Sequence, residues 1–193
     1  MKILLLAAHP DDIEFSMGAT VSKLIREGHE IYMFCFCDCD IKDEFYKSIT
    51  LFKQIKIIGI YDYKVRTLPE HRQQVLEILK NTTPYKMDVV YLPCSFDIHQ
   101  DHEVIHNEGV RAFKHSTIYG FSFAWNNIKE DLRHFELVTQ EDIDLKMRAI
   151  ECYKSQESRY YSNIDFILSQ IKVNGKKINR NFAECFEIIR TIK

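Results

Sequence analysis

The sequence predicts an α/β fold: a single Rossmann-like domain with a mostly parallel sheet flanked by helices. Short apolar runs alternate with longer amphipathic stretches, which is the rhythm of βαβ units. Residues 31–37 are apolar almost throughout, as in a strand that is covered on both faces. The 193 residues show no internal repeat and no domain break, so we expect one domain over residues 1–193.

The first half of the chain separates clearly into strand and helix patterns. Residues 2–8 form an apolar run that is too short to span a membrane, so we expect a strand there. Residues 18–27 place apolar side chains at helical spacing and end before Gly28, a residue typical of helix C-caps. The same criteria predict strands at residues 31–37, 57–61 and 88–93 and helices at residues 43–55 and 70–81.

The second half continues with two strands and four helices. The predicted strands are residues 118–123 and 135–138, and the predicted helices are residues 103–114, 141–153, 164–172 and 183–192. In the commonest doubly wound sheet, the first and fourth strands lie side by side where the strand order reverses, and ligands bind at their carboxyl ends. We therefore expect the functional site where residues 2–8 and 88–93 end.

Charge and cysteine content disfavour several classes of partner and location. The chain has 26 Lys and Arg against 28 Asp and Glu, so it carries no excess positive charge to attract nucleic acid or anionic lipid. The N-terminal run lacks a signal-peptide cleavage site. We therefore expect a cytoplasmic protein without an integral membrane segment, in which the six cysteines are reduced thiols.

Clusters of histidine and aspartate follow the first and the fourth predicted strands, residues 2–8 and 88–93. His9, Asp11 and Asp12 come after the first strand, and a segment from Asp97 to His102 comes after the fourth. Histidine and aspartate are common zinc ligands, and a catalytic zinc needs three protein ligands and one open position. Taken singly, an aspartate at a helix start is often only a cap and a histidine only a hydrogen-bonded residue. Two such clusters at neighbouring strand ends favour a metal site.

The two clusters, together with several other segments of the chain, resemble the sequence motifs of the PIG-L/LmbE-like metal-dependent deacetylases. That family removes acetyl groups from N-acetylglucosamine-type conjugates, and the resemblance covers most of the chain. The segments that carry it are Ala8-His9-Pro10-Asp11-Asp12-Ile13-Glu14, Gly18-Ala19-Thr20, Val65-Arg66, Asp97-x-His99-x-Asp101-His102, residues 147–156 and Ala183-Glu184-Cys185-Phe186.

The resemblance implies a role for each polar residue of the two clusters. The implied metal ligands are His9, Asp12 and His102, with Zn²⁺ as the cofactor and Fe²⁺, Co²⁺ or Mn²⁺ as alternatives. Asp11 corresponds to the general base that activates water. His99 corresponds to the residue that stabilises the oxyanion, here expected as an imidazolium, and Asp101 to the residue that holds its ring.

Three further residues are expected to bind the substrate, a small N-acetylated sugar, sugar nucleotide or glycoconjugate. Arg66 matches a family arginine that contacts sugar hydroxyls, although a loop arginine is equally often solvated. Asp97 stands where some members carry Tyr, and Trp125 either stacks on a sugar ring or packs in the interior. Glu14 either reaches the pocket or supports the first helical turn. Relatives are often oligomeric, which leaves a homo-oligomer open here, but no heptad or exposed apolar strand in the sequence identifies an interface.

Other interpretations remain open beside the deacetylase. The residues from His102 to His106 match HExxH, the zincin motif in which Glu103 would activate water. A non-catalytic metal-binding or sugar-binding module on the same fold would keep the ligands but would need neither Asp11 nor His99. The alternating Cys35, Cys37 and Cys39 indicate a core or sheet-edge role more than a metal site.

Overall fold

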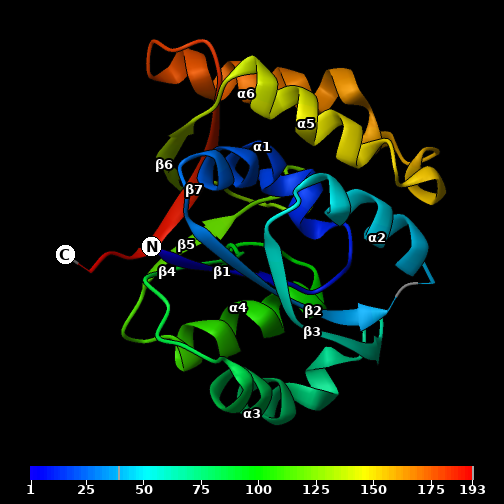
Figure 1. Ribbon diagram of the computed structural model, residues 1–193, viewed down its shortest axis with the longest axis vertical. Helices are drawn as coiled ribbons and strands as arrows, with labels where there is room; N and C mark the ends of the chain where they lie inside the picture. Colours follow the sequence, from blue (N-terminus) through cyan, green and yellow to red (C-terminus); the bar gives the residue numbers. More distant parts are fainter. Residues whose placement is uncertain (39, 193) are drawn as a thin grey trace.

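A seven-stranded sheet forms the centre of the computed structural model, which describes residues 1–38 and 40–192. The strand order within these residues is β3-β2-β1-β4-β5-β7-β6 (Figure 1). Neighbouring strands pair in parallel except where β7 meets β5 and β6. The strands are β1 (Lys2–Ala7), β2 (Glu30–Asp38), β3 (Ile55–Lys64), β4 (Val89–Pro93), β5 (Thr117–Phe121), β6 (Leu132–Leu137) and β7 (Ala183–Arg190).

Helices cover both faces of this sheet. One face carries α1, α2, α5 and α6, and the other carries α3 and α4 (Figure 1). The helices are α1 (Asp12–Arg26), α2 (Lys42–Leu51), α3 (Arg72–Thr82), α4 (Gln100–Ala112), α5 (Gln140–Ile150) and α6 (Ile164–Lys177). Three short 3₁₀ turns lie at Leu68–His71, Lys154–Gln156 and Tyr160–Ser162. The predicted α/β fold with a mostly parallel sheet is therefore confirmed.

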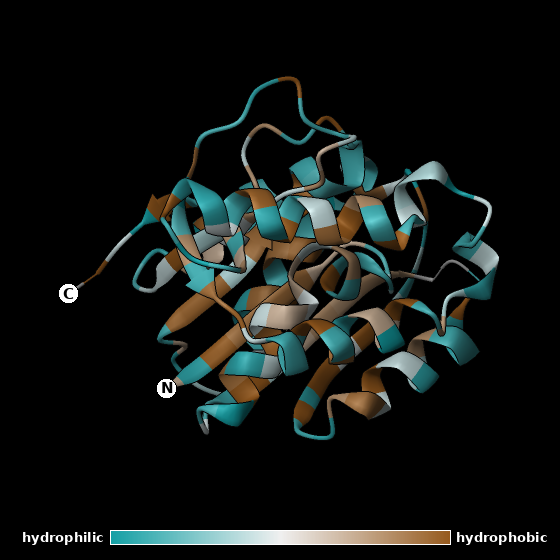
Figure 2. Ribbon diagram, turned by 90° about the horizontal axis from the view of Figure 1, so that it is seen from above, coloured by the Kyte–Doolittle hydropathy of each residue, from teal (hydrophilic) through white to brown (hydrophobic). Residues whose placement is uncertain are grey.

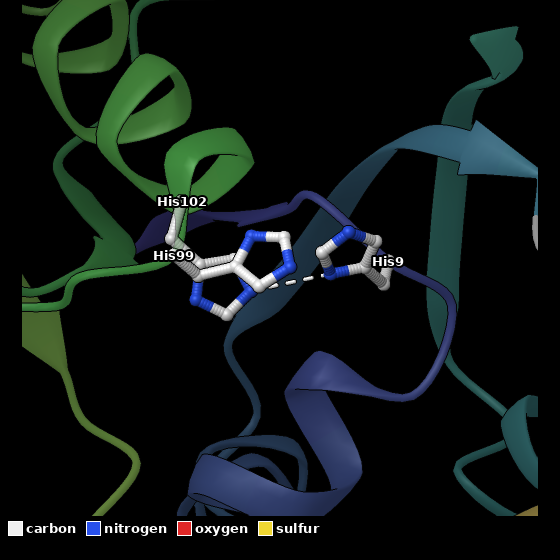
Figure 3. Close-up of side chains that lie close together, drawn as sticks. All are labelled: His9, His99 and His102. Carbon is white, nitrogen blue, oxygen red and sulfur yellow. Dashed lines mark hydrogen bonds between the residues drawn. The ribbon is translucent and has the colours of Figure 1, made fainter. Parts of the chain in front are cut away.

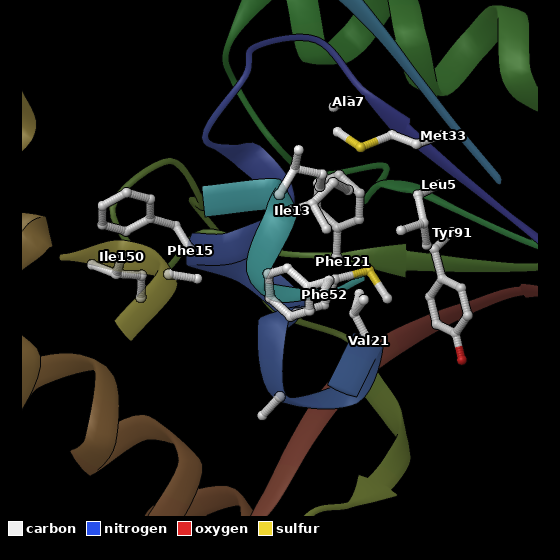
Figure 4. Close-up of a cluster of buried hydrophobic side chains, with 14 of the residues drawn as sticks. Leu5, Ala7, Ile13, Phe15, Val21, Met33, Phe52, Tyr91, Phe121 and Ile150 are labelled. Atoms are coloured by element: carbon white, nitrogen blue, oxygen red, sulfur yellow. The ribbon is translucent and has the colours of Figure 1, made fainter. Parts of the chain in front are cut away.

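The apolar core lies on both sides of β1, as the unbroken apolar sequence of that strand requires. Leu5 and Ala7 point to the cluster under α1, where they meet Ile13, Val21 and Met33 (Figure 4). The alternate residues of β1 face a second cluster under α3 and α4. The central strands are accordingly apolar, whereas the helices carry many hydrophilic residues (Figure 2).

Helix α1 begins earlier than its periodicity indicates, and it is interrupted. It begins at Asp12 rather than at residue 18, and Met17 has non-helical dihedrals (φ −136°, ψ 21°) inside it. The buried Lys146 of α5 packs beside this break, where a Cβ on Gly18 would lie only 3.0 Å from the Lys146 Cγ. Glycine at residue 18 therefore lets the two helices approach closely.

One predicted element is wrong in type. Residues 183–192 were expected to form a helix, but Ala183–Arg190 is strand β7, inserted between β5 and β6. The spacing of its apolar residues fits both a helix and a strand. Ile188 and Ile189 are β-branched, which favours a strand. Pairing with strands on both sides decides the outcome.

Two further expectations concern membranes and cysteines. Among the described residues, none of the helices combines the length and apolar character needed to traverse a bilayer. Cys37, Cys94, Cys152 and Cys185 are not in disulfides, as predicted for reduced thiols. Cys39 lies outside the described residues.

Candidate active site

The candidate site lies at the carboxyl ends of β1 and β4. These strands pair in parallel, with Ile3 opposite Val89, so the segments that follow them meet at one edge of the sheet. The first segment turns at Pro10 and enters α1, and the second enters α4 with His99 as its N-cap. The strand order confirms that the reversal point lies between the first and fourth strands.

Three side-chain atoms from His9, Asp12 and His102 form a small triangle. His9 Nδ1 lies 3.2 Å from His102 Nε2, and Asp12 Oδ1 lies 3.5 Å from His9 Nδ1 and 3.3 Å from His102 Nε2. In a tetrahedral site with metal–ligand bonds of about 2.0–2.1 Å, neighbouring ligand atoms are about 3.3 Å apart. The two nitrogens and one oxygen therefore fit a single divalent cation.

The backbone fixes the carboxylate of this triangle. Asp12 Oδ2 accepts hydrogen bonds of 2.8 Å from the N–H groups of Ala8 and His9, which leaves Oδ1 directed at the two rings. His9 faces His102 from the segment after β1, while His99 lies beside His102 at the start of α4 (Figure 3). Ring nitrogens of all three histidines lie within 4.8 Å of one another.

The outer nitrogens of the two histidines bind carboxylates. His102 Nδ1 lies 2.7 Å from Asp97 Oδ2, and His9 Nε2 lies 3.1 Å from Asp101 Oδ2. Carboxylates in this position orient a ligand ring and fix its tautomer. Asp97 does not line the cavity, so its expected role in substrate binding is corrected.

Asp101 also differs from its expected role. Its carboxylate binds His9 and accepts from the backbone N–H groups of Arg66 (2.6 Å) and Leu68 (3.1 Å), whereas only its backbone N–H reaches His99 Nδ1. Asp101 therefore orients His9 through its carboxylate, not His99. The contact also holds Arg66, whose φ of 70° lies in the left-handed region.

A cavity of about 520 Å³ opens onto the triangle. Asp11, His99, Arg66 and Trp125 all line it. The Asp11 carboxylate does not cap α1 and faces this space. The residues expected to act as base, metal ligands and sugar contacts therefore line one cavity.

Burial and neighbouring charges shift the pKa values of the adjacent Asp11 and Asp12 in opposite directions. Burial would raise the pKa of Asp12, but His102 and His9 hold it far below its ordinary value. Burial and the nearby Asp12 raise the pKa of Asp11 to about 6, a value suited to accepting and returning a proton near neutral pH. The pKa of His102, which burial would lower, is raised to about 9 by Asp12 and Asp97.

The surroundings of His99 favour the neutral ring over the expected imidazolium. Burial, together with repulsion from His102 and His9, lowers the pKa of His99 to about 4. The backbone N–H of Asp101 donates to His99 Nδ1 at 3.2 Å, so the neutral ring carries its hydrogen on Nε2. The ring can therefore donate a hydrogen bond without bearing a charge.

The alternative HExxH motif does not assemble. His106 Nδ1 lies 2.8 Å from the carbonyl oxygen of Pro93, and Glu103 is exposed. Neither residue lines the cavity that holds His102. The zincin interpretation is therefore wrong for this helix.

Glu14 does not reach the cavity. Its side chain is fully buried, and Oε1 accepts hydrogen bonds from Ser48 (2.6 Å) and Tyr153 (2.8 Å). Burial raises the pKa of Glu14 to about 7. The Tyr153 hydroxyl also lies 2.8 Å from the carbonyl oxygen of Pro10, so Glu14 supports the turn that carries Asp11.

The sequence interpretation missed one wall of the cavity. Gln156, Arg159, Tyr160 and Tyr161 line it from the segment between α5 and α6. The signal was a pair of tyrosines in a polar stretch, which no periodicity marks. Trp125 stacks on Tyr161, with ring centroids 4.5 Å apart and 14° between the planes.

Comparison with known proteins supports this description of the fold, and a family model matches the segment that contains the first cluster. Residues 4–50, which include His9, Asp11 and Asp12, match the model of the family described as PIG-L, GlcNAc-PI de-N-acetylase. The N,N'-diacetylchitobiose deacetylase from Pyrococcus horikoshii, in complex with its inhibitor MPG, aligns with a TM-score of 0.75 at 21% identity over 97% of this chain and 83% of its own.

Two other solved structures share the fold at lower identity. The zinc-inhibited form of teicoplanin deacetylase Orf2 aligns with a TM-score of 0.71 at 13% identity over 96% of this chain and 97% of its own. GalB, the 4-carboxy-2-hydroxymuconate hydratase from Pseudomonas putida KT2440, aligns with a TM-score of 0.76 at 12% identity over 100% of this chain and 97% of its own. The family match over residues 4–50 and the fold shared along nearly the whole chain confirm the resemblance to the PIG-L/LmbE-like family.

Proposed function

We propose that this protein is a metal-dependent hydrolase that removes an N-acetyl group from an amino sugar, a sugar nucleotide or an N-acetylglucosamine-type glycoconjugate. The observation that carries the proposal is the triangle of His9, Asp12 and His102, bordered by Asp11 and His99 in one cavity. The family match and the deacetylases of the same fold support it. Residues 1–193 act as one catalytic unit in this proposal.

His9, Asp12 and His102 would hold the cation, Zn²⁺ or Fe²⁺. When bound, such a cation polarises the amide carbonyl and increases the nucleophilicity of water. Asp97 and Asp101 keep the two rings oriented through their outer nitrogens. Ligand binding at the rings requires unprotonated nitrogens, so the cation replaces protons there.

Asp11 and His99 carry the proton transfer and the charge stabilisation. The Asp11 carboxylate accepts a proton from the attacking water and returns it to the amide nitrogen as the C–N bond breaks. Water and the amide thereby give acetate and a free amine. The Nε2–H of His99 donates to the carbonyl oxygen as negative charge develops there. Arg66 and Trp125, on the cavity wall, bind the sugar.

Release of acetate tests this proposal. Purified protein of known metal content is given a panel of N-acetylglucosamine conjugates and sugar nucleotides, with and without a chelator. We expect release that stops on chelation and returns when one divalent cation is added. Saturable sugar binding without acetate release would contradict the proposal and support a binding module. Because GalB shares the fold, hydration of an unsaturated acid is assayed in parallel as a different reaction.

A further inference from the structure

A second cavity lies next to the candidate site. It has a volume of about 850 Å³ and is formed by the loop after β5, the end of α5 and the start of α6. Trp125, Ile150, Tyr160, Ile164 and Phe166 supply most of its apolar wall. None of the histidines or aspartates of the candidate site lines it. Its size falls in the range of cavities that bind small molecules.

This second cavity adjoins the one above the triangle. Both are lined by Trp125, Arg159 and Tyr160. The Trp125 ring stacks on Tyr161 of the first cavity and lies 6.4 Å, centroid to centroid, from Phe166 of the second. A ligand that fills both cavities would therefore contact Trp125 on its way from one to the other.

Apolar side chains are exposed around the second cavity. Tyr160 is 75% exposed, and Ile164 and Phe166 are each 37% exposed. Aromatic and aliphatic side chains gathered at a concave surface mark a binding site for an apolar group, because covering them removes apolar surface from water.

The charged groups at the rim argue against an anionic occupant. Glu151, Glu157 and Asp165 are matched by only two cations, Lys154 and Arg159. A phosphate or carboxylate group would therefore meet more negative than positive charge. The charged lining therefore disfavours an anionic group, and the aromatic and aliphatic side chains favour an apolar one.

We propose that the second cavity binds an apolar alkyl or aryl aglycone of the amino sugar whose N-acetyl group is cleaved beside Asp11. This inference rests on the proposed function for the identity of the sugar, and it places the preferred substrate among glycosides that carry a neutral apolar group. Trp125 is the residue that the sugar and the aglycone share.

Fluorescence of Trp125 tests the binding directly, because it is the only tryptophan in the chain. The whole protein is titrated with hexyl β-D-glucoside and phenyl β-D-glucoside, with methyl β-D-glucoside as the control that lacks an apolar aglycone. We expect a saturable change in fluorescence with the hexyl or phenyl compound at concentrations at least about tenfold lower than with the methyl compound, which corresponds to ~1.4 kcal/mol. Equal affinity for all three glucosides would overturn the inference.

A pair of variants on α6 localises the binding. Ile164→Ser removes an apolar wall of the second cavity, whereas Val173→Ser changes a residue of the same helix that is 56% exposed and lines neither of the two cavities. We expect Ile164→Ser to weaken binding of the hexyl glucoside about three- to tenfold and to leave that of the methyl glucoside unchanged, by the loss of buried apolar surface. Identical binding by both variants and the parent would contradict the inference.

Acetate release separates this inference from the proposed function. The substrates are the hexyl and methyl glycosides of N-acetyl-β-D-glucosamine. A lower KM for the hexyl compound, lost in Ile164→Ser, supports both proposals. Acetate release with equal KM for both compounds, without preferential binding of apolar glucosides, overturns the inference and leaves the function standing. Preferential binding without acetate release from either compound contradicts the function and supports the aglycone site.

Discussion

Asp11 and Asp12 are adjacent in sequence, yet their surroundings give them different chemistry. Asp12 is tied to two backbone N–H groups and two imidazoles, whereas Asp11 faces the cavity. We expect Asp11→Asn to retain the bound cation and to lower kcat for acetate release about 10²–10⁴-fold, because the proton acceptor is lost. Metal analysis and initial rates check both parts. Glu103→Gln, at an exposed position on α4, is the control. Full activity of Asp11→Asn would exclude Asp11 as the base.

Tyr153 holds the turn that presents Asp11. Its hydroxyl lies 2.8 Å from both the Pro10 carbonyl oxygen and Glu14 Oε1, and the residue is 2% exposed. Tyr153→Phe removes the hydroxyl from the Pro10 carbonyl oxygen and leaves Glu14 Oε1 with Ser48 alone, so we expect a loss of about 1–3 kcal/mol in the free energy of unfolding. Urea unfolding measures it, with Tyr46→Phe at an exposed position as the control. Unchanged stability would show that the turn does not depend on this hydroxyl.

Residue types at the strand ends predicted the cluster but not every partner within it. His9, Asp12 and His102 meet because β1 and β4 are neighbours, as expected from the commonest strand order of a doubly wound sheet. The carboxylates of Asp97 and Asp101 could not be assigned in the same way, because their direction depends on the turn that leads into α4. That turn directs Asp97 to His102 and Asp101 to His9.

At the scale of elements, the interruption of α1 depends on a buried ion pair. Lys146 Nζ donates to Glu184 Oε1 (2.5 Å) and to the Ser16 carbonyl oxygen (3.2 Å), and Glu184 Oε2 accepts from the N–H of Thr20 (2.6 Å). The pair therefore satisfies backbone groups that the break leaves without helical partners.

Removing one member of this ion pair leaves the other charge buried without a partner. We expect Lys146→Met to lower the free energy of unfolding by about 3–5 kcal/mol, because Glu184 would remain buried without its partner cation. Adding Glu184→Gln removes that charge while keeping an acceptor for Thr20, so the double variant should be more stable than Lys146→Met alone. Urea unfolding of both single variants and the double variant gives the coupling. Additive effects would show that the two side chains do not stabilise each other.

The error at β7 shows where sequence patterns are insufficient. Its residues satisfy a helical period and a strand period alike, and the pattern contains no information about the gap between β5 and β6. In contrast, residues 2–8 and 31–37 were placed almost to their ends, because a strand buried on both faces has to be apolar throughout. Long-range pairing, which local periodicity does not report, decided the ambiguous segment.

At the scale of the whole molecule, the ligand cluster links folding, protons and the cation. The folded pKa of His102 is about 9, above an ordinary value of about 6.5. The charged form of His102 therefore stabilises the metal-free folded protein below about pH 6.5. This contribution to the free energy of unfolding is lost as the pH rises toward 9. We expect the Tm of chelated protein to fall over that interval. Thermal unfolding in EDTA at several pH values measures this, and a Tm that rises with pH would contradict the assignment.

The affinity for the cation should change with pH in the opposite direction to the Tm of the metal-free protein. Protons on His9 and His102 compete with the cation, since the pKa of each is raised by Asp12 and its outer carboxylate against the effect of burial. Raising the pH from about 6 to 8 should therefore tighten cation binding by about ten- to a hundredfold per pH unit, according to whether one or two protons are displaced. Calorimetry in buffers of different ionisation enthalpy counts those protons, and His106→Asn, outside the cluster, should leave the count unchanged. Binding that released no protons and did not vary with pH would mean that the cation is held elsewhere, so this experiment tests the ligand assignment without any substrate.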